Sequence, residues 1–244
     1  MKNTMSDVSI AKLIFFVFLI YGVLPTALIR FTGIGAVTRA PAGRRLVAIT
    51  FDDGPDPRYT PRVLDVLEKH QIKACFFLVG KKALEHPEIV RRIAAAGHEI
   101  GVHGYSHKPA WVLGPRATAR EIDRAISAVE GVTGQKPLYF RPAWGLFNLF
   151  SPIYCRKRGV KFVLWTYMSW DWTKKATPES IIKRTLRRLT DGAILVFHDS
   201  DTTPGAAAGS PDKMVAALSV IIEALKSKGM SAVPLKETGI CKTK

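Results

Sequence analysis

Five short segments of this 244-residue chain combine acidic, basic, histidine and tryptophan residues, and each lies just beyond a run of apolar residues. In chain order the segments are Asp52-Asp53-Gly54-Pro55, His103-Gly104-Tyr105-Ser106-His107, Arg141-Pro142-Ala143-Trp144-Gly145, Trp170-Asp171-Trp172 and His198-Asp199. If the apolar runs are parallel strands, their carboxyl ends meet at one edge, where such folds build active sites. Core packing does not account for five polar clusters at one edge, so the pattern indicates a functional site.

Two carboxylates and two imidazoles in this set have the spacing of a hydrolytic metal site. Asp52 and Asp53 can divide the work, one binding a metal and the other accepting a proton, although Asp-Asp-Gly-Pro is also an ordinary turn sequence. His103 and His107 can reach one ion if the segment turns, although histidine is also a common polar surface residue. Together with Asp53 they would leave coordination positions open for water and substrate.

A second group of side chains can supply an acid. His198 emerges at the end of the apolar run 193–197, where it is either a functional group or a strand-terminal surface residue. Asp171 and Arg141 are the partners that we expect to orient it. A carboxylate beside an imidazole raises the pKa of the imidazole, and an arginine beside a carboxylate keeps that carboxylate ionised. The sequence therefore predicts a carboxylate base that is kept ionised and an imidazole acid whose pKa is raised.

The elements that must position these residues alternate from residue 45 onward. Predicted strands are rich in Val, Ile, Leu and Phe, as strands covered on both faces are, and span 46–51, 74–79, 99–103, 138–141, 162–166, 193–198 and 231–233. Predicted helices span 61–69, 87–96, 117–132, 178–189 and 213–228. This alternation predicts parallel strands with crossover helices, arranged as an open doubly wound sheet or a barrel of seven or eight strands.

The five motifs, in this order, resemble those of the polysaccharide deacetylases, the NodB-like carbohydrate esterases of family four. The resemblance covers residues 45–235 and implies an α/β fold, an irregular (β/α) barrel of about seven parallel strands preceded here by an N-terminal hydrophobic helix. By this resemblance TFDDGP makes Asp52 the general base and Asp53 a metal ligand. HGYSH adds His103 and His107 as the other ligands.

The remaining motifs imply the other roles. In RPAWG, Arg141 would brace Asp52, and the backbone N–H of Trp144 would help to hold the oxyanion. His198 would be the general acid, with Asp171 beside it among the catalytic residues. The expected substrate-binding residues are Pro142, Trp144, Trp172 and Val196.

Five positions depart from the usual motifs of the family. Gly104 replaces a Ser or Thr, Ala143 a Pro and Trp144 a Tyr. Met168 replaces the first acid of D-x-x-D-W, and Val196 the Leu of L-x-H, which would shrink one wall of the acetyl pocket. Every residue expected to perform chemistry is present, and the departures fall on residues that shape substrate binding. The resemblance implies a metal-dependent hydrolase of non-peptide carbon–nitrogen bonds, with Zn2+ as the expected cofactor and Co2+ as a possible substitute.

The expected reaction removes N-acetyl groups from a polysaccharide or oligosaccharide that contains N-acetylglucosamine, such as peptidoglycan or a chitin-like chain, and releases acetate. One alternative is an O-deacetylase of an acetylated polysaccharide such as xylan, and another is a deacylase of a lipid-linked sugar. A third, from a different class, is a catalytically silent carbohydrate-binding protein, which predicts the loss of a metal ligand or base. None of these residues is lost here.

The composition bears on partners. Lys and Arg number 36 against 20 Asp and Glu, a net charge of +16, which suits an anionic neighbour such as nucleic acid, anionic lipid or a cell wall, or simply aids solubility. No run interleaves basic and aromatic residues as nucleic-acid modules do, so we expect a glycan substrate, no nucleic acid and a monomeric catalytic domain. Cys75, Cys155 and Cys241 are too few and too isolated for a disulfide framework or a thiol nucleophile.

The N-terminal segment contains seventeen uncharged residues, 13–29, after Lys12. This length is at the short end for a spanning helix and beyond that of a typical secretory signal core. We expect a signal-anchor or signal segment over 1–29, a linker over 30–44 and the catalytic domain over 45–240, with a buried core helix as the other reading.

The orientation of that segment has two opposing indicators. Four arginines follow it within 30–45, and the positive-inside rule alone would keep the catalytic domain in the cytoplasm. Folded domains often override this bias. We expect a membrane-anchored protein with an extracytoplasmic catalytic domain, or a secreted one if the segment is cleaved.

Overall fold

A parallel β-sheet of eight strands forms the centre of the computed structural model, which describes residues 4–240. The order of the strands is β5-β4-β3-β2-β1-β7-β6, and β8 pairs with β1 outside this path. Their bounds are β1 Leu46–Asp52, β2 Cys75–Leu78, β3 Glu99–Val102, β4 Tyr139–Phe140, β5 Lys161–Phe162, β6 Tyr167–Met168, β7 Ile194–His198 and β8 Ser231–Ala232. The predicted α/β fold with parallel, buried strands is confirmed.

The sheet curls toward a barrel because its two edges are joined by very little chain. β5 ends at Phe162 and β6 begins at Tyr167, so the edges lie at most about 18 Å apart along an extended chain. Val37 forms a parallel bridge with Val163 in this gap. The single strand predicted over 162–166 is therefore wrong. Most of that stretch crosses between the two edges and makes its hydrogen bonds to Val37 and to Ile194.

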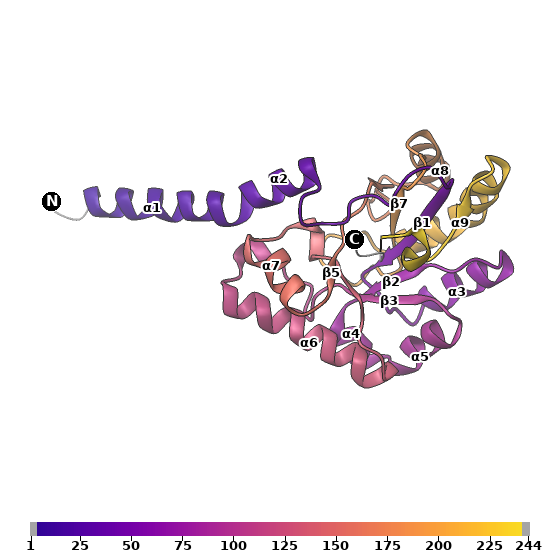
Figure 1. Ribbon diagram of the computed structural model, residues 1–244, viewed down its shortest axis with the longest axis horizontal. Coiled ribbons are helices and arrows are strands. Elements are labelled where there is room, and N and C mark those ends of the chain that lie inside the picture. Colours follow the sequence, from indigo (N-terminus) through magenta and orange to yellow (C-terminus); the bar gives the residue numbers. More distant parts are fainter. Residues whose placement is uncertain (1–3, 241–244) are drawn as a thin grey trace.

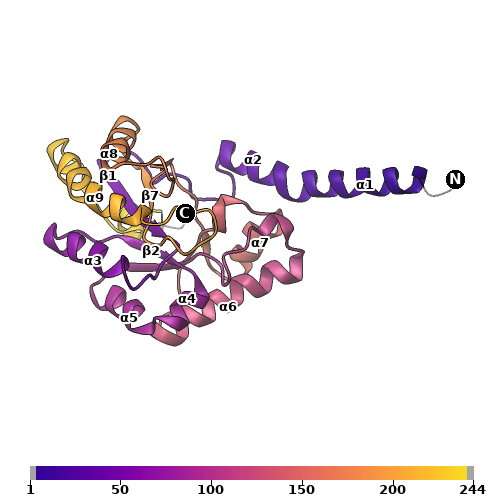
Figure 2. The same cartoon turned by 180° about the vertical axis from the view of Figure 1, so that it is seen from behind.

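Helices surround the sheet on the outside (Figures 1 and 2). Their bounds are α3 Thr60–Lys69, α4 Gly80–Glu85, α5 Pro87–Ala95, α6 Pro115–Thr133, α7 Phe150–Lys157, α8 Pro178–Arg187 and α9 Ser210–Ser227. Prolines stand in the first turn of several of them, where the missing N–H costs nothing. All five predicted helices are present. Helices α4 and α7, only six and eight residues long, were not predicted.

The core lies between the sheet and these helices. Phe51 of β1 stacks on Phe76 of β2 with ring centres 5.0 Å apart and lies 6.1 Å from Phe197 of β7. All seven residues of β1 are buried, because this strand has neighbours on both sides and helices over it. The strand that ends at Asp52, directly before Asp53, is therefore held by neighbouring strands on both sides.

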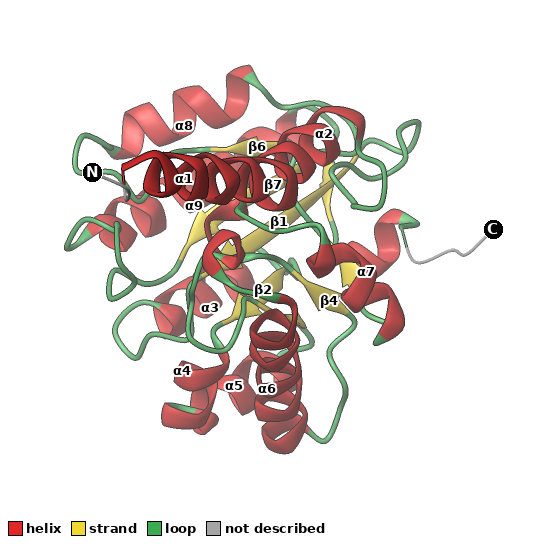
Figure 3. Cartoon of the chain, turned by 90° about the vertical axis from the view of Figure 1, so that its left-hand side faces the viewer, coloured by secondary structure: helices red, strands yellow, loops and turns green. Residues whose placement is uncertain are grey.

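The N-terminal segment is one long helical rod, formed by α1 Thr4–Phe18, a π-helical turn η1 Leu19–Val23 and α2 Leu24–Thr32. It projects from the domain, with α1 directed away and α2 against it (Figure 1). Figure 3 views the domain with this rod in front. The stretch Ser9–Thr32 is long and apolar enough to cross a membrane, and only 17% of its most apolar window is buried. The predicted N-terminal hydrophobic helix is confirmed.

The residues after the rod lie on the sheet rather than apart from it. The N–H of Val37 donates to the carbonyl of Phe162, and the N–H of Leu164 donates back to Val37. Further on, the N–H of Ala40 donates to Gly192, with an N–O distance of 2.8 Å. Three short 3₁₀ helices lie in the connecting segments of the described chain, at η2 Ala110–Val112, η3 Ala143–Gly145 and η4 Leu235–Thr238.

Candidate active site

The structure brings the five polar segments together at the carboxyl edge of the sheet. Asp52 ends β1, and its register partner in the neighbouring strand β7 is His198. On the other side of the sheet, Val102 of β3 pairs with Phe140 of β4, so the loops that follow them also meet. Adjacent parallel strands end at the same edge of the sheet, so Asp52 and His198 are neighbours there although they lie 146 positions apart in the chain.

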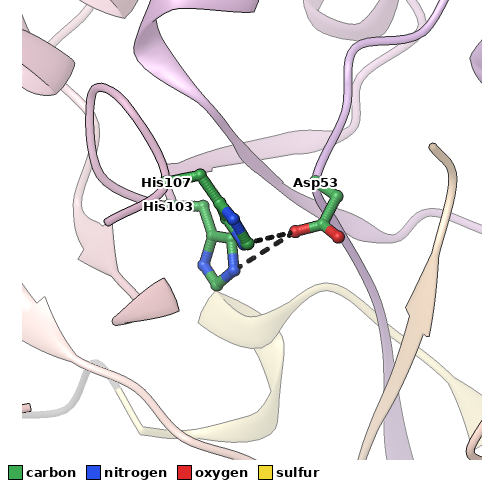
Figure 4. Close-up of side chains that lie close together, drawn as sticks. All are labelled: Asp53, His103 and His107. Carbon is green, nitrogen blue, oxygen red and sulfur yellow. Dashed lines mark ion pairs between the residues drawn. The ribbon is translucent and has the colours of Figure 1, made fainter. Parts of the chain in front are cut away.

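Asp53, His103 and His107 form a compact cluster at this edge (Figure 4). Nε2 of His107 lies 3.0 Å from Oδ1 of Asp53, and Nε2 of His103 lies 3.5 Å from the same oxygen. One potential ligand atom of each residue lies within 4.8 Å of the others, and all three side chains are buried. The arrangement offers two nitrogens and one oxygen to a common point.

The hydrogen bonds of the cluster suit a divalent metal ion. Oδ1 of Asp53 is buried without a hydrogen bond, because the nearby ring nitrogens lie outside hydrogen-bonding geometry, while Oδ2 accepts the hydroxyl of Thr203 at 2.6 Å. Nδ1 of His103 lies 2.9 Å from the carbonyl oxygen of Arg141. That contact favours the tautomer with the proton on Nδ1 and directs the lone pair of Nε2 toward Asp53. Two imidazoles, one carboxylate and open positions are the donor set of a catalytic zinc site.

The electrostatics and backbone of the cluster agree with this fit. Burial is the main reason that the pKa of His103 is lowered to about 4, which keeps its ring neutral and able to bind a metal. Burial by itself raises the pKa of Asp53, but the neighbouring imidazoles outweigh it and hold this pKa far below its usual range. Asp53 and His107 also have φ angles of 78° and 55°, a strained conformation that is common at functional sites.

Arg141 holds Asp52 in place from beneath the cavity. Nη1 of this fully buried arginine donates to Oδ1 of Asp52 at 2.6 Å and to Oγ1 of Thr50 at 2.7 Å. Nη2 donates to the carbonyl of Leu164 at 2.9 Å, and the guanidinium lies 3.9 Å from the ring centre of Phe77. One carboxylate oxygen is thereby committed to the arginine, and Oδ2 faces the histidines, 3.9 Å from Nε2 of His103.

His198 is held by Asp171 on the opposite side of the cavity. Nδ1 of His198 lies 3.0 Å from Oδ1 of Asp171, and the backbone N–H of His198 donates to Oδ2 at 2.7 Å. The hydroxyl of Ser169 also donates to this carboxylate. Burial alone lowers the pKa of His198, but the charge and hydrogen bond of Asp171 reverse that effect and raise it to about 9. The imidazole is therefore protonated at neutral pH, as a proton donor must be.

A cavity of about 270 Å³ connects these groups. It is lined by Arg30, Asp52, Asp53, His103, His107, Trp144, Gly145, Trp165, Met168, Trp170, Trp172, His198, Pro204, Gly205 and Ala206. The wall is mainly apolar and includes four tryptophans. Aromatic faces and a few convergent polar groups are what a site for a sugar-sized ligand needs.

The eleven predicted residues fall into three groups with respect to this cavity. Seven of them line it, and Arg141 and Asp171 act from behind Asp52 and His198 through the contacts given above. Pro142 and Val196 are not among the lining residues in the part of the chain that the structure describes. Val196 is buried in β7, where it pairs with Met168, so the sequence-based roles of these two residues remain predictions.

Several lining residues were missed from the sequence. Trp170 lies next to Asp171 and could have been found from that position, and Met168 stands where the resemblance expects an acid. Trp165 and Arg30 carried no local signal, because only the tertiary fold places them at the cavity. Arg30 comes from the apolar helix rather than from the catalytic domain. Cys241, which we do not expect to act as a nucleophile, lies outside the described residues.

Comparison with known proteins gives one consistent answer. The polysaccharide deacetylase family model matches residues 39–163. A peptidoglycan-N-acetylglucosamine deacetylase of Bacillus cereus is 34% identical over 195 residues, which are 80% of this chain and 68% of that protein. A chitooligosaccharide deacetylase of a Bradyrhizobium species is 34% identical over 202 residues, 80% of this chain and 91% of that protein.

A solved structure extends the likeness to the fold. It is a peptidoglycan N-acetylglucosamine deacetylase in complex with 4-naphthalen-1-yl-N-oxidanyl-benzamide. It superposes with a TM-score of 0.79 at 31% identity and covers 86% of this chain and 95% of its own. Sequence, fold and relatives thus agree with the motifs at the sheet edge. The chain belongs to the polysaccharide deacetylase family.

Proposed function

We propose that this protein is a metal-dependent hydrolase that removes N-acetyl groups from N-acetylglucosamine-containing polysaccharides or oligosaccharides and releases acetate. The observation that carries the proposal is the geometry around one cavity. Three candidate metal ligands lie between a carboxylate fixed by Arg141 and an imidazole fixed by Asp171. The names of the relatives, which act on peptidoglycan and on chitooligosaccharides, support the substrate class.

Asp53, His103 and His107 would hold the metal, and Zn2+ or Co2+ bound there would supply Lewis acidity toward the acetamide carbonyl and toward a water molecule. Oδ2 of Asp52 accepts the proton of the attacking water, because its other oxygen is occupied by Arg141. The backbone N–H of Trp144 is assigned to the developing oxyanion, as the resemblance suggests.

His198 completes the reaction as the proton donor. The scissile bond joins an acyl carbon to the sugar nitrogen, and an amine leaves only when that nitrogen receives a proton. His198 carries one at neutral pH because Asp171 raises its pKa to about 9. The products are acetate and a free amino sugar. Asp171 and Arg141 are positioning residues in this scheme, since they act through His198 and Asp52.

The aromatic wall accounts for the choice of a sugar. Trp144 is 44% exposed and Trp170 49% exposed, so both leave ring surface open to an incoming ligand. Pyranose rings bury their C–H faces against such rings. We assign the catalytic domain to the extracytoplasmic side, held by the apolar helix, as a monomer without a nucleic-acid partner. The length and composition of Ser9–Thr32 support the anchor.

The test is acetate release from N-acetylglucosamine pentamer and from peptidoglycan by the full chain in detergent, first stripped of metal and then supplied with Zn2+ or Co2+. Asp52→Asn should abolish metal-dependent release. Asp65→Asn is the matched control, because Asp65 forms an exposed ion pair with Arg92 on the outer helices. Release that survives Asp52→Asn would contradict the assigned base. Tight metal binding without release from either glycan would favour an O-acetylated substrate or a silent carbohydrate-binding protein.

A further inference from the structure

Arg30 places a cation in the catalytic cavity from outside the catalytic domain. Its guanidinium carbon lies 4.2 Å from the ring centre of Trp165, and both residues line the cavity. Gly145 makes room for it, since a Cβ there would lie 2.8 Å from Nη1 of Arg30. Arg30 is exposed, and among the residues that the structure describes no carboxylate or carbonyl accepts a hydrogen bond from it. Its N–H groups are available to a ligand.

The position of Arg30 is set by specific contacts between the apolar rod and the domain. The hydroxyl of Thr26 donates to the carbonyl of Phe147 at 2.6 Å and accepts Nε1 of Trp111 at 2.8 Å. One turn earlier, the carbonyl of Tyr21 accepts the N–H of Leu149 at 2.8 Å. Thr26 is buried by these contacts. Because Thr26 lies four residues before Arg30, one turn of α2 links this anchoring point to the cavity.

Apolar side chains without cover lie beside this cation. Leu24, Leu28 and Phe31 follow one another at helical spacing on α2 and are 51%, 61% and 94% exposed. On the domain, apolar residues near the root of the rod are exposed as well, namely Val112, Leu149 and Ile153. Figures 1 and 3 show the rod leaving the domain at this side. Such a surface continues a helix long enough to cross a bilayer, so we assign it to lipid.

We propose that Arg30 binds a phosphate group of the substrate, and that this substrate is an N-acetylated sugar joined through phosphate to a membrane lipid. The proposal rests on the proposed function and names its substrate class. A guanidinium with free N–H groups recognises phosphate oxygens through charge-assisted hydrogen bonds. A sugar joined to lipid through phosphate brings an anion to Arg30 and an apolar chain to the adjoining face, while its sugar occupies the cavity that Arg30 lines. The net charge of +16 on the chain also suits a membrane surface that carries anionic lipid phosphates.

The experiment uses the full chain, loaded with Zn2+, in detergent micelles. Acetate release is measured from three substrates that differ by one feature each. They are N-acetylglucosamine joined by phosphate to a short polyprenol, N-acetylglucosamine 1-phosphate, and the neutral methyl glycoside of N-acetylglucosamine. Arg30→Gln is compared with Arg39→Gln, a control whose guanidinium donates to the carbonyl of Asp191 outside the cavity.

The lipid-linked sugar should be the best substrate of the unaltered protein. Arg30→Gln should lower kcat/KM for both phosphate-bearing substrates about tenfold more than for the methyl glycoside, the effect of losing one charge-assisted hydrogen bond. Arg39→Gln should behave as the unaltered protein. An equal loss on all three substrates would show that Arg30 is only structural and would overturn the proposal. Equal kcat/KM for the lipid-linked and lipid-free phosphates would overturn its lipid part.

Calorimetry separates this proposal from the proposed function. N-acetylglucosamine 1-phosphate should bind the metal-free chain more tightly than the methyl glycoside, and Arg30→Gln should remove the difference. If no substrate releases acetate while this Arg30-dependent binding persists, the proposed function fails and the phosphate site stands. A dimer in micelles that Phe31→Ser dissociates would show that a second copy covers the apolar face, and would overturn the assignment to lipid.

Discussion

Replacing Asp171 with Asn tests the assignment of His198 as the acid, because Asp171 is the group that raises the pKa of His198 most. In the native site the pKa of His198 is raised from 6.5 to about 9, against a burial effect that lowers it. Asp171→Asn removes the charge and leaves the burial, while the carboxylates of Asp52 and Asp53 still favour the imidazolium. We expect a fall of about two pH units, equivalent to about 2.7 kcal/mol.

The assay is the pH dependence of kcat/KM for acetate release, which reports the acid and base of the free enzyme. The acid must be protonated, so its alkaline limb should move down by about two pH units, and activity at pH 8 should fall about tenfold. A bound cation shifts the limbs of both proteins in the same direction, so the difference between them is the measured quantity.

Ser169→Ala is the matched control, since it removes a hydroxyl that donates to Asp171 but keeps the carboxylate. Its limb should remain close to that of the unaltered protein. If Asp171→Asn folds normally and its alkaline limb coincides with the native one, His198 is not the acid that Asp171 tunes.

Two further predictions concern stability. The pKa of His103 is about 4 in the folded, metal-free protein against an ordinary 6.5, so between these values the folded protein binds fewer protons than the unfolded chain. The free energy of unfolding should therefore be highest above pH 6.5 and fall by up to about 3 kcal/mol toward pH 4. Urea titrations of His103→Gln should show a much smaller fall. Arg141→Met leaves the buried carboxylate of Asp52 unpaired and should cost about 3–5 kcal/mol of unfolding free energy in urea, whereas adding Asp52→Asn should recover part of it; a strictly additive double variant would refute the pairing.

The parallel sheet explains why so much of the site could be predicted. Once strands were recognised from their apolar runs, their polar ends had to meet at one edge, and the β1–β7 register places Asp52 opposite His198. The contact between His198 and Asp171 follows the same logic, because β6 pairs with β7 just before both residues. Local patterns were sufficient wherever the relevant partners were adjacent strands.

The rest depends on contacts that no local pattern contains. Trp165 reaches the cavity because residues 163–166 cross between the two sheet edges instead of continuing β5. Arg30 reaches it because Thr26 docks on Phe147, 121 residues away in the chain. Charge and hydropathy show that an apolar segment precedes the domain, but they cannot show that its last turn enters the catalytic cavity.

The central claim is that Asp53, His103 and His107 hold one divalent metal ion on which acetate release depends. The most direct measurement is a titration of Zn2+ into the stripped protein, in which metal bound and the rate of acetate release are followed together. The rate should rise linearly to one equivalent of Zn2+ and then level off, and His107→Ala should lose both the binding and the rate. A rate that is independent of Zn2+, or full activity in His107→Ala, would contradict the account.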